Sequence, residues 1–398
     1  MDYSFTPEQE ALRSEFDEFF KENMTESPPG WRGGIEGTYE SEENWAFHLN
    51  MARKLAAKEW LVQSWPKEYG GKNASPIEQM IFSESAGYHK APGVDIFGVS
   101  MIGPAILAMG TEEQKEEHLP PIARGEIMWC QGWSEPDAGS DLAALSTRGV
   151  RAGDNYIVNG QKIWTTGAHK ADWIFLIVRT DPESKRSKGL TFLLADKNTP
   201  GITVNPILMM NGTHSFNEVF LDDVRIPVAN RLGEENEGWK VTLAVMNFER
   251  FSVGDLAHSK RNLEELVGFC KETKEGGTSL IKNPHVKHRL VDLFIECEVA
   301  RVMVYKTAWL VEKGELHKSM APASAAKLVC SEFAQRLAYE GLKIMGLLGQ
   351  VKEGSKWSPL HGSFEHAYQL CMAANIAAGT SEIQKNLIAW TAMGLPRK

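Results

Sequence analysis

The chain has 398 residues, enough for two or three domains around a sizeable core. Its formal net charge of −9 argues against sequence-independent binding of nucleic acid, and no apolar run reaches the length of a membrane span. The five cysteines are scattered, odd in number and without metal-site spacing, so we expect reduced cytoplasmic thiols and no metal site. The first residues lack the basic and apolar stretches of a secretory signal.

Residues 1–125 are expected to form an N-terminal helical domain. Three capping residues precede a proline or acidic residues, the pattern that begins a helix: Thr6, Ser75 and Thr111. Between the first two of these starts, the glycine-rich stretch 30–41 indicates a surface loop.

Residues 126–234 are expected to form a middle β domain, a barrel or a sandwich. Residues 147–166 carry Gly-Asp-Asn and Asn-Gly turn sequences between short strands, which is the hairpin signal. Residues 173–181 and 189–196 are rich in β-forming side chains, and Pro227 ends the last predicted strand.

Residues 235–398 are expected to form a C-terminal helical bundle, because long amphipathic stretches are joined by short loops. These stretches are 238–274, 284–313, 322–348, 362–377 and 381–393. The order helical, β, helical predicts an α+β fold class.

The segment 129–143, WCQGWSEPDAGSDLA, is the densest polar cluster of the β region. Its glycines and hydroxyls, with Gln131 and Ser134, allow backbone N–H groups to approach the oxygens and ring nitrogens of a ligand. The alternative is a tight Ser/Gly turn without a ligand, and local features leave both open.

The segment 161–169, QKIWTTGAH, places Trp164 beside Thr165 and Thr166 at the end of a predicted strand. A tryptophan with neighbouring hydroxyls can stack on a planar heterocycle and hydrogen-bond to it. A core tryptophan followed by threonines that favour β structure fits the same letters, so the local pattern does not decide.

Three motifs follow one another along the chain: SEPDAGSD at 134–141, GQKIWTT at 160–166 and GTSEIQ at 379–384. Together with the helical–β–helical order, they resemble the acyl-CoA dehydrogenase family over essentially the whole length. The resemblance implies an acyl-CoA dehydrogenase-like fold and FAD held noncovalently between the β domain and the C-terminal bundle. It also implies α,β-dehydrogenation of an acyl-CoA thioester.

The resemblance further implies where the ligands bind. Expected FAD contacts are Gln131, Trp133 and Ser134 on the pyrimidine side, Trp164, Thr165 and Thr166 near the isoalloxazine, and Thr380 and Glu382 near the adenosine. Gly346 and Gly349 match a turn that meets FAD of a neighbouring subunit. Expected substrate contacts are Ser140, Arg250, Ala378 and Gly379, with His169 and His214 as further candidates to line the site.

The chain departs from the family pattern in two places. An R-x-Q-F-G segment is absent, and Lys343 replaces a common glutamine before the glycine-rich turn. These departures leave the adenine and pyrophosphate contacts open.

The catalytic base is the critical residue, because removing a weakly acidic α-proton requires a carboxylate. Many family members carry a glutamate immediately before G-T-S, but this chain has Ala378 there. The resemblance offers a second position, on a helix early in the C-terminal domain, which matches Glu249. A surface Glu–Arg pair is the alternative for Glu249 and Arg250, and we expect Arg250 to be structural rather than catalytic.

A second carboxylate, Asp95, is either a loop cap or a residue of the deep acyl pocket. In the pocket it would serve a ring-directed dehydrogenation or bind a polar tail. The small pair Ala377–Ala378 favours branched, cyclic or otherwise bulky acyl groups, and the sequence is similar to bacterial members acting on dicarboxyl, alicyclic or steroid side-chain thioesters.

The resemblance implies electron-transfer flavoprotein as the electron acceptor and a homotetramer in the cytoplasm. Two other functions stay open. One is an oxidase that uses O2, and the other is a non-catalytic or FAD-sharing subunit of a heteromer, which the missing base at Ala378 makes worth considering.

Overall fold

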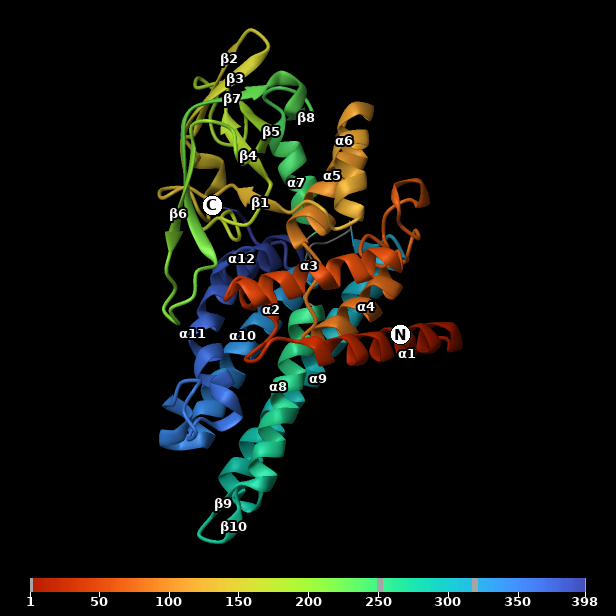
Figure 1. The fold of residues 1–398 in the computed structure, drawn as a ribbon, viewed down its shortest axis with the longest axis vertical. Helices are drawn as coiled ribbons and strands as arrows, with labels where there is room; N and C mark the ends of the chain where they lie inside the picture. The colour runs from red at the N-terminus through yellow and green to blue at the C-terminus, as the bar shows by residue number, and fades with distance from the viewer. Residues whose placement is uncertain (1–2, 249–252, 317–320, 398) are drawn as a thin grey trace. The chain divides into compact units, whose positions relative to one another are not determined.

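The computed structural model describes residues 3–248, 253–316 and 321–397 (Figure 1). The chain forms two compact units. The helical unit comprises Met1–Gly37, Ser75–Ala91 and Phe251–Lys398, and the mixed unit comprises Thr38–Ala74 and Pro92–Arg250. Glu249 and Arg250 lie outside the described residues.

The helical unit is built from long helices whose first residues carry caps. Its α-helices are α1 (Pro7–Asn23), α2 (Gly34–Gly37), α4 (Pro76–Tyr88), α8 (Val253–Glu272), α9 (Pro284–Glu312), α10 (Ala321–Met345), α11 (Ser363–Ile376) and α12 (Ser381–Thr391). Thr6 and Ser75 form complete capping boxes, each with a proline in the first turn. Each cap satisfies backbone N–H groups that lack a helical partner, so these predicted helix starts are confirmed.

The core of the helical unit lies among α4, α8, α9 and α10, where α8 and α9 run side by side (Figure 1). Leu266, Ala300 and Ala308 are completely buried there. A short hairpin of β9 (Lys274–Glu275) and β10 (Thr278–Ser279) joins α8 to the segment before α9. The apolar stripes predicted for these helices therefore supply one common core.

The mixed unit combines one large sheet with four α-helices in its described part. The helices are α3 (Glu42–Ala57), α5 (Gly103–Met109), α6 (Glu112–Ala123) and α7 (Gly238–Phe248). The strands are β1 (Trp129–Gly132), β2 (Arg148–Ala152), β3 (Asn155–Lys162), β4 (Trp173–Arg179), β5 (Leu190–Asp196), β6 (Ile202–Ile207), β7 (Phe216–Pro227) and β8 (Arg231–Leu232). Thr111 caps α6 with a third capping box, as predicted.

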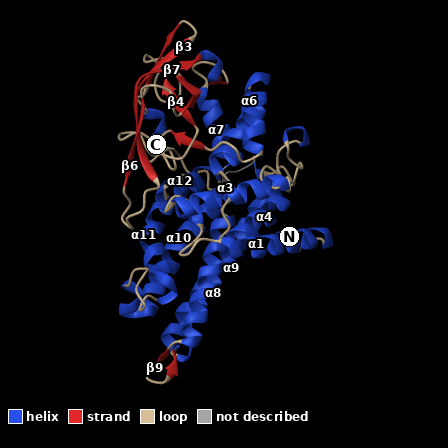
Figure 2. Cartoon of the chain, in the orientation of Figure 1, coloured by secondary structure: helices blue, strands red, loops and turns tan. Residues whose placement is uncertain are grey.

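The sheet has the order β6-β7-β3-β2-β4-β5-β8, and β1 pairs with β4 in parallel. Figure 2 shows these strands gathered in one region, with β9 elsewhere in the helical unit. The alternate side chains of β3, β4 and β7 fill a common core that includes Val158, Ile174 and Val224, all completely buried. This pairing brings the residues after β1 and after β3 onto one scaffold.

One of the two predicted turns in 147–166 is confirmed and the other is wrong. Gly153 and Asp154 connect β2 to β3 as a two-residue hairpin turn. Asn159–Gly160 instead lies inside β3, where the register to β7 shifts. A Cβ at Gly160 would lie 2.5 Å from Thr147 Oγ1, so this glycine permits close packing at a bulge and makes no turn.

The predicted α+β class is confirmed, with helical segments before and after a middle β region. Helix α4 belongs to the same compact unit as the C-terminal helices. The domain boundaries predicted after residues 125 and 234 stay a prediction. In the described residues no helix combines the length and apolar character that a membrane crossing requires.

Candidate active site

The segment after β1 holds the first group of predicted cofactor residues. Gln131 lies in β1 and is half-buried, while Trp133 is buried with its ring edge-on to Phe175 and Phe192. The carbonyl of Ser134 accepts a hydrogen bond of 2.9 Å from the backbone of Ile163, the residue after β3. The two predicted cofactor segments are therefore joined directly.

A buried ion pair between Lys162 and Glu135 holds this segment in place. Lys162 Nζ is fully buried and donates to Glu135 Oε1 at 2.8 Å and to the carbonyls of Trp133 and Ile177 at 3.2 and 2.8 Å. Glu135 also accepts from the backbone N–H groups of Ser146 and Thr147. These bonds set the direction of the Trp133 carbonyl.

Burial raises the pKa of Glu135, but the attraction of Lys162 and the hydrogen bonds of its neighbours outweigh it and hold that pKa at about 2. The carboxylate is therefore ionised throughout the neutral range. Neither Glu135 nor Lys162 was predicted as a site residue, although they lie inside the motifs 134–141 and 160–166.

The loop after β3 presents the second group. Trp164 has a left-handed backbone with φ of 60°, and its ring is 56% exposed. Few tryptophans adopt this conformation, and such strain gathers at ligand sites. Thr165 is completely buried and donates its backbone N–H to the carbonyl of Asn217, while Thr166 is half-buried.

These residues fit the predicted flavin. Within the described residues, the buried polar atoms Thr165 Oγ1, Ser215 Oγ and Trp133 Nε1 have no hydrogen-bond partner. Buried polar groups are normally paired, so these atoms are suited to a ligand or an ordered water. With the exposed ring of Trp164 they would hold a planar, polar heterocycle such as the isoalloxazine of FAD.

Ser140, predicted to contact the thioester, is exposed in the turn that follows Glu135. His169 and His214 lie together, with ring centroids 4.0 Å apart. Both histidines therefore belong to the same part of the mixed unit as Thr165, whose backbone pairs with the strand that begins after His214.

Asp95 is 9% exposed and caps the π-helix Ile96–Ile102. Its Oδ1 accepts from Phe97 N at 3.1 Å, and its Oδ2 accepts from Gly98 N and Trp129 N, both at 3.0 Å. Burial raises the pKa of Asp95 to about 7, against the three backbone N–H donors. These contacts support the loop-capping alternative, and a catalytic role for Asp95 stays a prediction.

Replacement of Asp95 with asparagine is expected to lower the free energy of unfolding by about 1–3 kcal/mol, because the amide N–H₂ would face a backbone donor. The folded-state pKa of Asp95, about 7, lies above its ordinary value of 3.8. The folded state then binds more protons between these values, so the stability contributed by Asp95 falls as pH rises from about 4 to about 7. Denaturant unfolding across this range should show that the difference in free energy of unfolding between wild type and variant shrinks as pH rises. A difference that stays constant would contradict the raised pKa of Asp95.

The predicted adenosine residues, and Ala378 and Gly379 of the predicted substrate residues, lie in the helical unit at the turn between α11 and α12. Ala378 and Gly379 both have left-handed backbones, with φ of 53° and 84°. Thr380 caps α12 by accepting from Ile383 N at 3.2 Å, and Glu382 is exposed in the first turn.

Two residues absent from the prediction hold this turn. Lys327 Nζ on α10 donates to the carbonyls of Ala374 and Gly379 at 3.0 and 2.9 Å. Gln384 Nε2 donates to the carbonyls of Ala378 and Gly379 at 3.0 and 3.3 Å. The glutamine belongs to the quoted G-T-S-E-I-Q motif, but no local signal marks the lysine.

Gly346 and Gly349 lie in the 3-10 turn Gly346–Gln350 after α10. Gly346 is exposed with φ of 61°. Gly349 is buried, and a Cβ there would lie 2.9 Å from the carbonyl oxygen of Leu342. Gly349 is therefore explained by packing, whereas Gly346 is free to meet a ligand or a neighbouring chain.

The catalytic prediction at Glu249 lies outside the described residues, as does Arg250. The helix that precedes them, α7, begins at Gly238, and its Val245 is completely buried. Two further apolar residues of α7 are less buried, since Leu243 is 46% exposed and Met246 is half-buried. The role of Glu249 stays a prediction.

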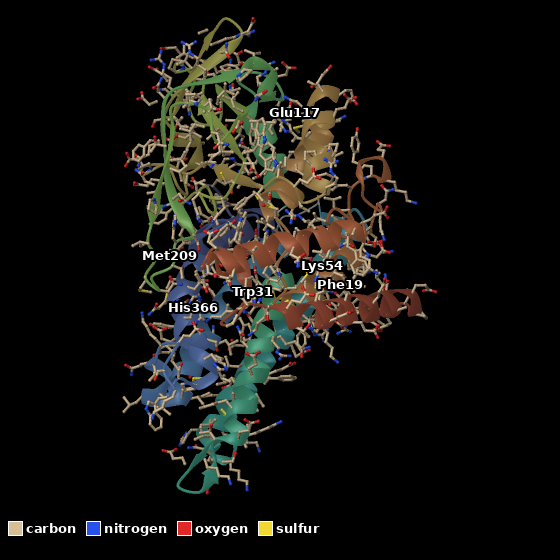
Figure 3. All side chains as sticks on the ribbon, viewed as in Figure 1. Phe19, Trp31, Lys54, Glu117, Met209 and His366 are labelled. Atoms are coloured by element: carbon tan, nitrogen blue, oxygen red, sulfur yellow. The ribbon has the colours of Figure 1, made fainter. Side chains whose placement is uncertain are left out.

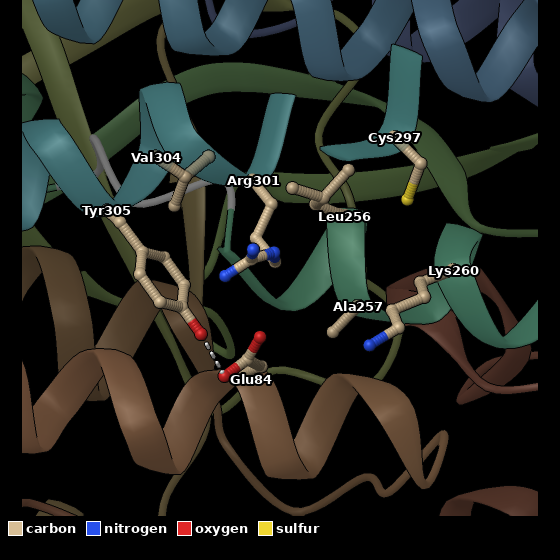
Figure 4. Close-up of a pocket in the computed structure, with 8 residues that line it drawn as sticks. All are labelled: Glu84, Leu256, Ala257, Lys260, Cys297, Arg301, Val304 and Tyr305. Carbon is tan, nitrogen blue, oxygen red and sulfur yellow. Dashed lines mark hydrogen bonds between the residues drawn. The ribbon is translucent and has the colours of Figure 1, made fainter. Parts of the chain in front are cut away.

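Two hollows in the helical unit contain none of the predicted residues. The first is lined by Glu84, Leu256, Ala257, Lys260, Cys297, Arg301, Val304 and Tyr305 (Figure 4). Tyr305 donates to Glu84 at 2.7 Å, which accounts for the polar groups facing each other there. The second, of about 250 Å³, adjoins it and is lined by Arg13, Asp17, Glu84, Ser85, Tyr88, Ala257 and Lys260. Ser85 donates to Asp17 at 2.6 Å and Tyr305 donates to Glu84, and we assign no chemistry to either hollow.

Comparison with known proteins gives matches along almost the whole chain. Residues 6–126, 130–224 and 236–393 match the family models described as the N-terminal, middle and C-terminal domains of acyl-CoA dehydrogenase. Acyl-CoA dehydrogenase FadE26 of Mycobacterium tuberculosis is 35% identical, over 100% of this chain and 99% of the relative.

Two solved structures are similar over the full length of both chains. One is the ChsE4–ChsE5 complex from Mycobacterium tuberculosis, with a TM-score of 0.88 and 35% identity, covering 100% of each chain. The other is titled Tcur3481–Tcur3483 steroid ACAD, with a TM-score of 0.88 and 29% identity, again covering 100% of each chain.

Proposed function

Because the chain belongs to the acyl-CoA dehydrogenase family, whose members are FAD-dependent oxidoreductases, we propose that it oxidises the α and β carbons of an acyl-CoA thioester. The observation that carries this proposal is the loop after β3. There the exposed, left-handed Trp164 precedes Thr165, whose buried hydroxyl has no partner among the described residues. Bound FAD supplies the acceptor for the hydrogen that leaves the β carbon.

The chain's own residues must position the thioester, stabilise the charge that develops on its carbonyl oxygen and remove the α-proton. Hydroxyls and backbone N–H groups suit the second task. We assign proton removal to Glu249, since a carboxylate is needed and Ala378 offers only a methyl group. Asp95 is the candidate for a ring-directed reaction, although its three backbone donors support a capping role.

We propose a bulky acyl group as the substrate: branched, alicyclic, dicarboxyl or carried on a steroid side chain. The exposed, small side chains of Ala377 and Ala378 support this class, because they occupy little space at the turn before α12. A structure similar along the whole chain is titled a steroid ACAD, which supports the steroid side chain within this class.

The test is an anaerobic titration of the FAD-containing protein with straight, branched, dicarboxyl, alicyclic and steroid side-chain acyl-CoAs. We expect the visible absorbance of the flavin to fall with the bulky thioesters. Preference for a straight medium chain by a wide margin would contradict the substrate class, and rapid peroxide formation in air would favour an oxidase over a dehydrogenase.

We propose that the chain works as an oligomer. Val291, Phe294, Ile295, Val299 and Val302 recur along α9 at helical spacing and are 47, 58, 54, 51 and 44% exposed. An apolar face of this kind is typical of a surface covered by another chain. A homotetramer is the expected assembly, and a complex with a second dehydrogenase-like chain is the alternative, supported by similarity to the ChsE4–ChsE5 complex. The native mass, and the number of different chains that copurify, distinguish the two.

We further propose a cytoplasmic location and electron-transfer flavoprotein as the acceptor. All five cysteines are free and buried, which fits a reducing compartment. Anaerobic reduction of excess electron-transfer flavoprotein by acyl-CoA and a catalytic amount of this protein tests the acceptor, because reduction beyond the amount of enzyme requires repeated turnover.

A further inference from the structure

The loop between β3 and β4 is held by a short ladder to the residues before and at the start of β7. Thr165 N donates to the carbonyl of Asn217 at 3.0 Å, and Gly167 N donates to the carbonyl of Ser215 at 2.9 Å. The loop departs from β3 after Lys162, two residues before the exposed Trp164. Its conformation therefore depends on what holds residues 215–217.

The side chain of Asn217 is the centre of this arrangement and is completely buried. Its Nδ2 donates to the carbonyl of Thr165 at 2.9 Å, so Asn217 holds Thr165 through both backbone and side chain. The second hydrogen of the same Nδ2 points to His169 Nδ1 at 3.2 Å, and Oδ1 lies 2.7 Å from His214 Nε2.

These contacts define the tautomer of His169 and the proton on one ring nitrogen of His214. Because Asn217 Nδ2 is a donor, His169 Nδ1 must accept, so His169 is neutral with its proton on Nε2. Because Asn217 Oδ1 is an acceptor, His214 Nε2 must carry a proton and donate it. Burial, with His214 and Lys170 nearby, lowers the pKa of His169 to about 4, which agrees with a neutral ring.

The imidazole pair is supported on its other side. The two rings stack at 4.0 Å with 24° between their planes, and His169 meets Tyr39 edge-on at 5.5 Å. Tyr39 also packs on the loop itself, since a Cβ at Gly167 would lie 2.3 Å from Tyr39 Oη. The charged groups facing His169 are Lys170 and Glu42, which pair with each other at 2.5 Å.

We propose that His169, His214 and Asn217 are positioning residues for the cofactor loop Trp164–Thr166. His214 donates to the Asn217 amide oxygen and so orients the amide. The amide nitrogen then donates one hydrogen bond to His169 and one to the Thr165 carbonyl, which fixes the position of that carbonyl. The flanking Trp164 and Thr166 are then held in place before the ligand arrives, which lowers the ordering cost of binding. This inference rests on the proposed function, because it concerns how the same loop meets FAD.

The test uses two replacements of His214 that separate hydrogen bonding from ring stacking. A His214→Phe variant keeps a flat ring against His169 but cannot donate to Asn217. A His214→Gln variant loses the ring, but its side-chain amide can donate from nearly the same place as Nε2. A His118→Gln variant controls for the loss of a buried imidazole elsewhere in the mixed unit, since His118 on α6 is 1% exposed.

FAD affinity and the visible flavin spectrum are measured by titrating apoprotein at a temperature where every variant is folded. We expect the phenylalanine variant to bind FAD about fivefold more weakly, the factor for one hydrogen bond of about 1 kcal/mol, with a shifted flavin band. The glutamine variant and the His118 control should bind as the wild type does.

Equal FAD affinity and equal spectra for the phenylalanine and glutamine variants would overturn the inference, even if the phenylalanine variant melts at a lower temperature. Weaker binding by glutamine than by phenylalanine would overturn it as well, because stacking would then matter more than the donor. A wild type that binds no FAD is a different outcome, and it contradicts the proposed function itself.

Discussion

Replacing Glu249 with glutamine is expected to slow anaerobic reduction of the flavin by about 10²–10⁴-fold, the usual contribution of a positioned base. Glutamine has nearly the same shape but cannot accept the α-proton. FAD and acyl-CoA should still bind, because the amide preserves the volume of the side chain. Stopped-flow measurement of flavin absorbance after mixing with a bulky acyl-CoA checks the result.

Two companion variants sharpen this experiment. Glu237→Gln removes an exposed carboxylate that lies just before α7 and pairs with Lys240 on that helix. The flavin of this variant should be reduced at the wild-type rate. Adding Ala378→Glu to Glu249→Gln supplies a carboxylate at the other position used in the family. We expect partial recovery, because the carboxylate would then approach the α-proton from a different segment of the chain. A wild-type rate in Glu249→Gln would remove Glu249 as the base.

Replacing Lys162 with methionine is expected to lower the free energy of unfolding by about 3–5 kcal/mol, the cost of leaving a buried charge without its partner. Glu135 is 6% exposed and would keep its carboxylate without the Nζ contact. The Trp133 carbonyl would also lose a donor, so FAD affinity should fall. Urea unfolding and FAD titration measure the two effects.

The matched control is Arg151→Met, which breaks an ion pair of 3.2 Å with Glu235 on the surface of the same unit. Arg151 is 53% exposed, so this change should cost less than about 1 kcal/mol. Combining Lys162→Met with Glu135→Gln should recover part of the lost stability, since the buried charge is then removed. A Lys162→Met cost as small as the control's would contradict the importance of the buried pair.

The fold features that the sequence predicted well are those whose causes are local. The capping boxes at Thr6, Ser75 and Thr111 involve residues three apart, so their helix starts can be predicted from the letters alone. The prediction of a turn at Asn159–Gly160 was wrong, because Gly160 packs closely against Thr147. That contact forms only when β2, β3 and β7 are paired, so the local sequence does not reveal it.

Long-range partnerships could not be predicted. Glu135 and Lys162 are 27 residues apart, and nothing near either one marks a buried ion pair. His169 and His214 were expected near the site, but their stack and their shared bonds to Asn217 follow from the meeting of the β3–β4 loop with β7. In the helical unit, Lys327 reaches Gly379 from another helix, 52 residues away in sequence.

The hairpin loop between β6 and β7 is a similar case. It carries Met209, which Figure 3 labels, and the neighbouring Leu208 and Met210 are 72 and 66% exposed. No structure was predicted for residues 207–210, and the strand β6 ends at Ile207. Met209 is half-buried, so two of these three adjacent apolar side chains are exposed.

The most direct test of the central claim uses wild-type protein with bound FAD and no second dehydrogenase-like chain. The protein is mixed anaerobically with a bulky acyl-CoA carrying either hydrogen or deuterium at the α carbon. We predict that the flavin is reduced, that enoyl-CoA forms in equal amount, and that α-deuterium slows the reduction, because a base within this chain removes that proton. Flavin that stays oxidised with acyl-CoAs of every class would contradict the account.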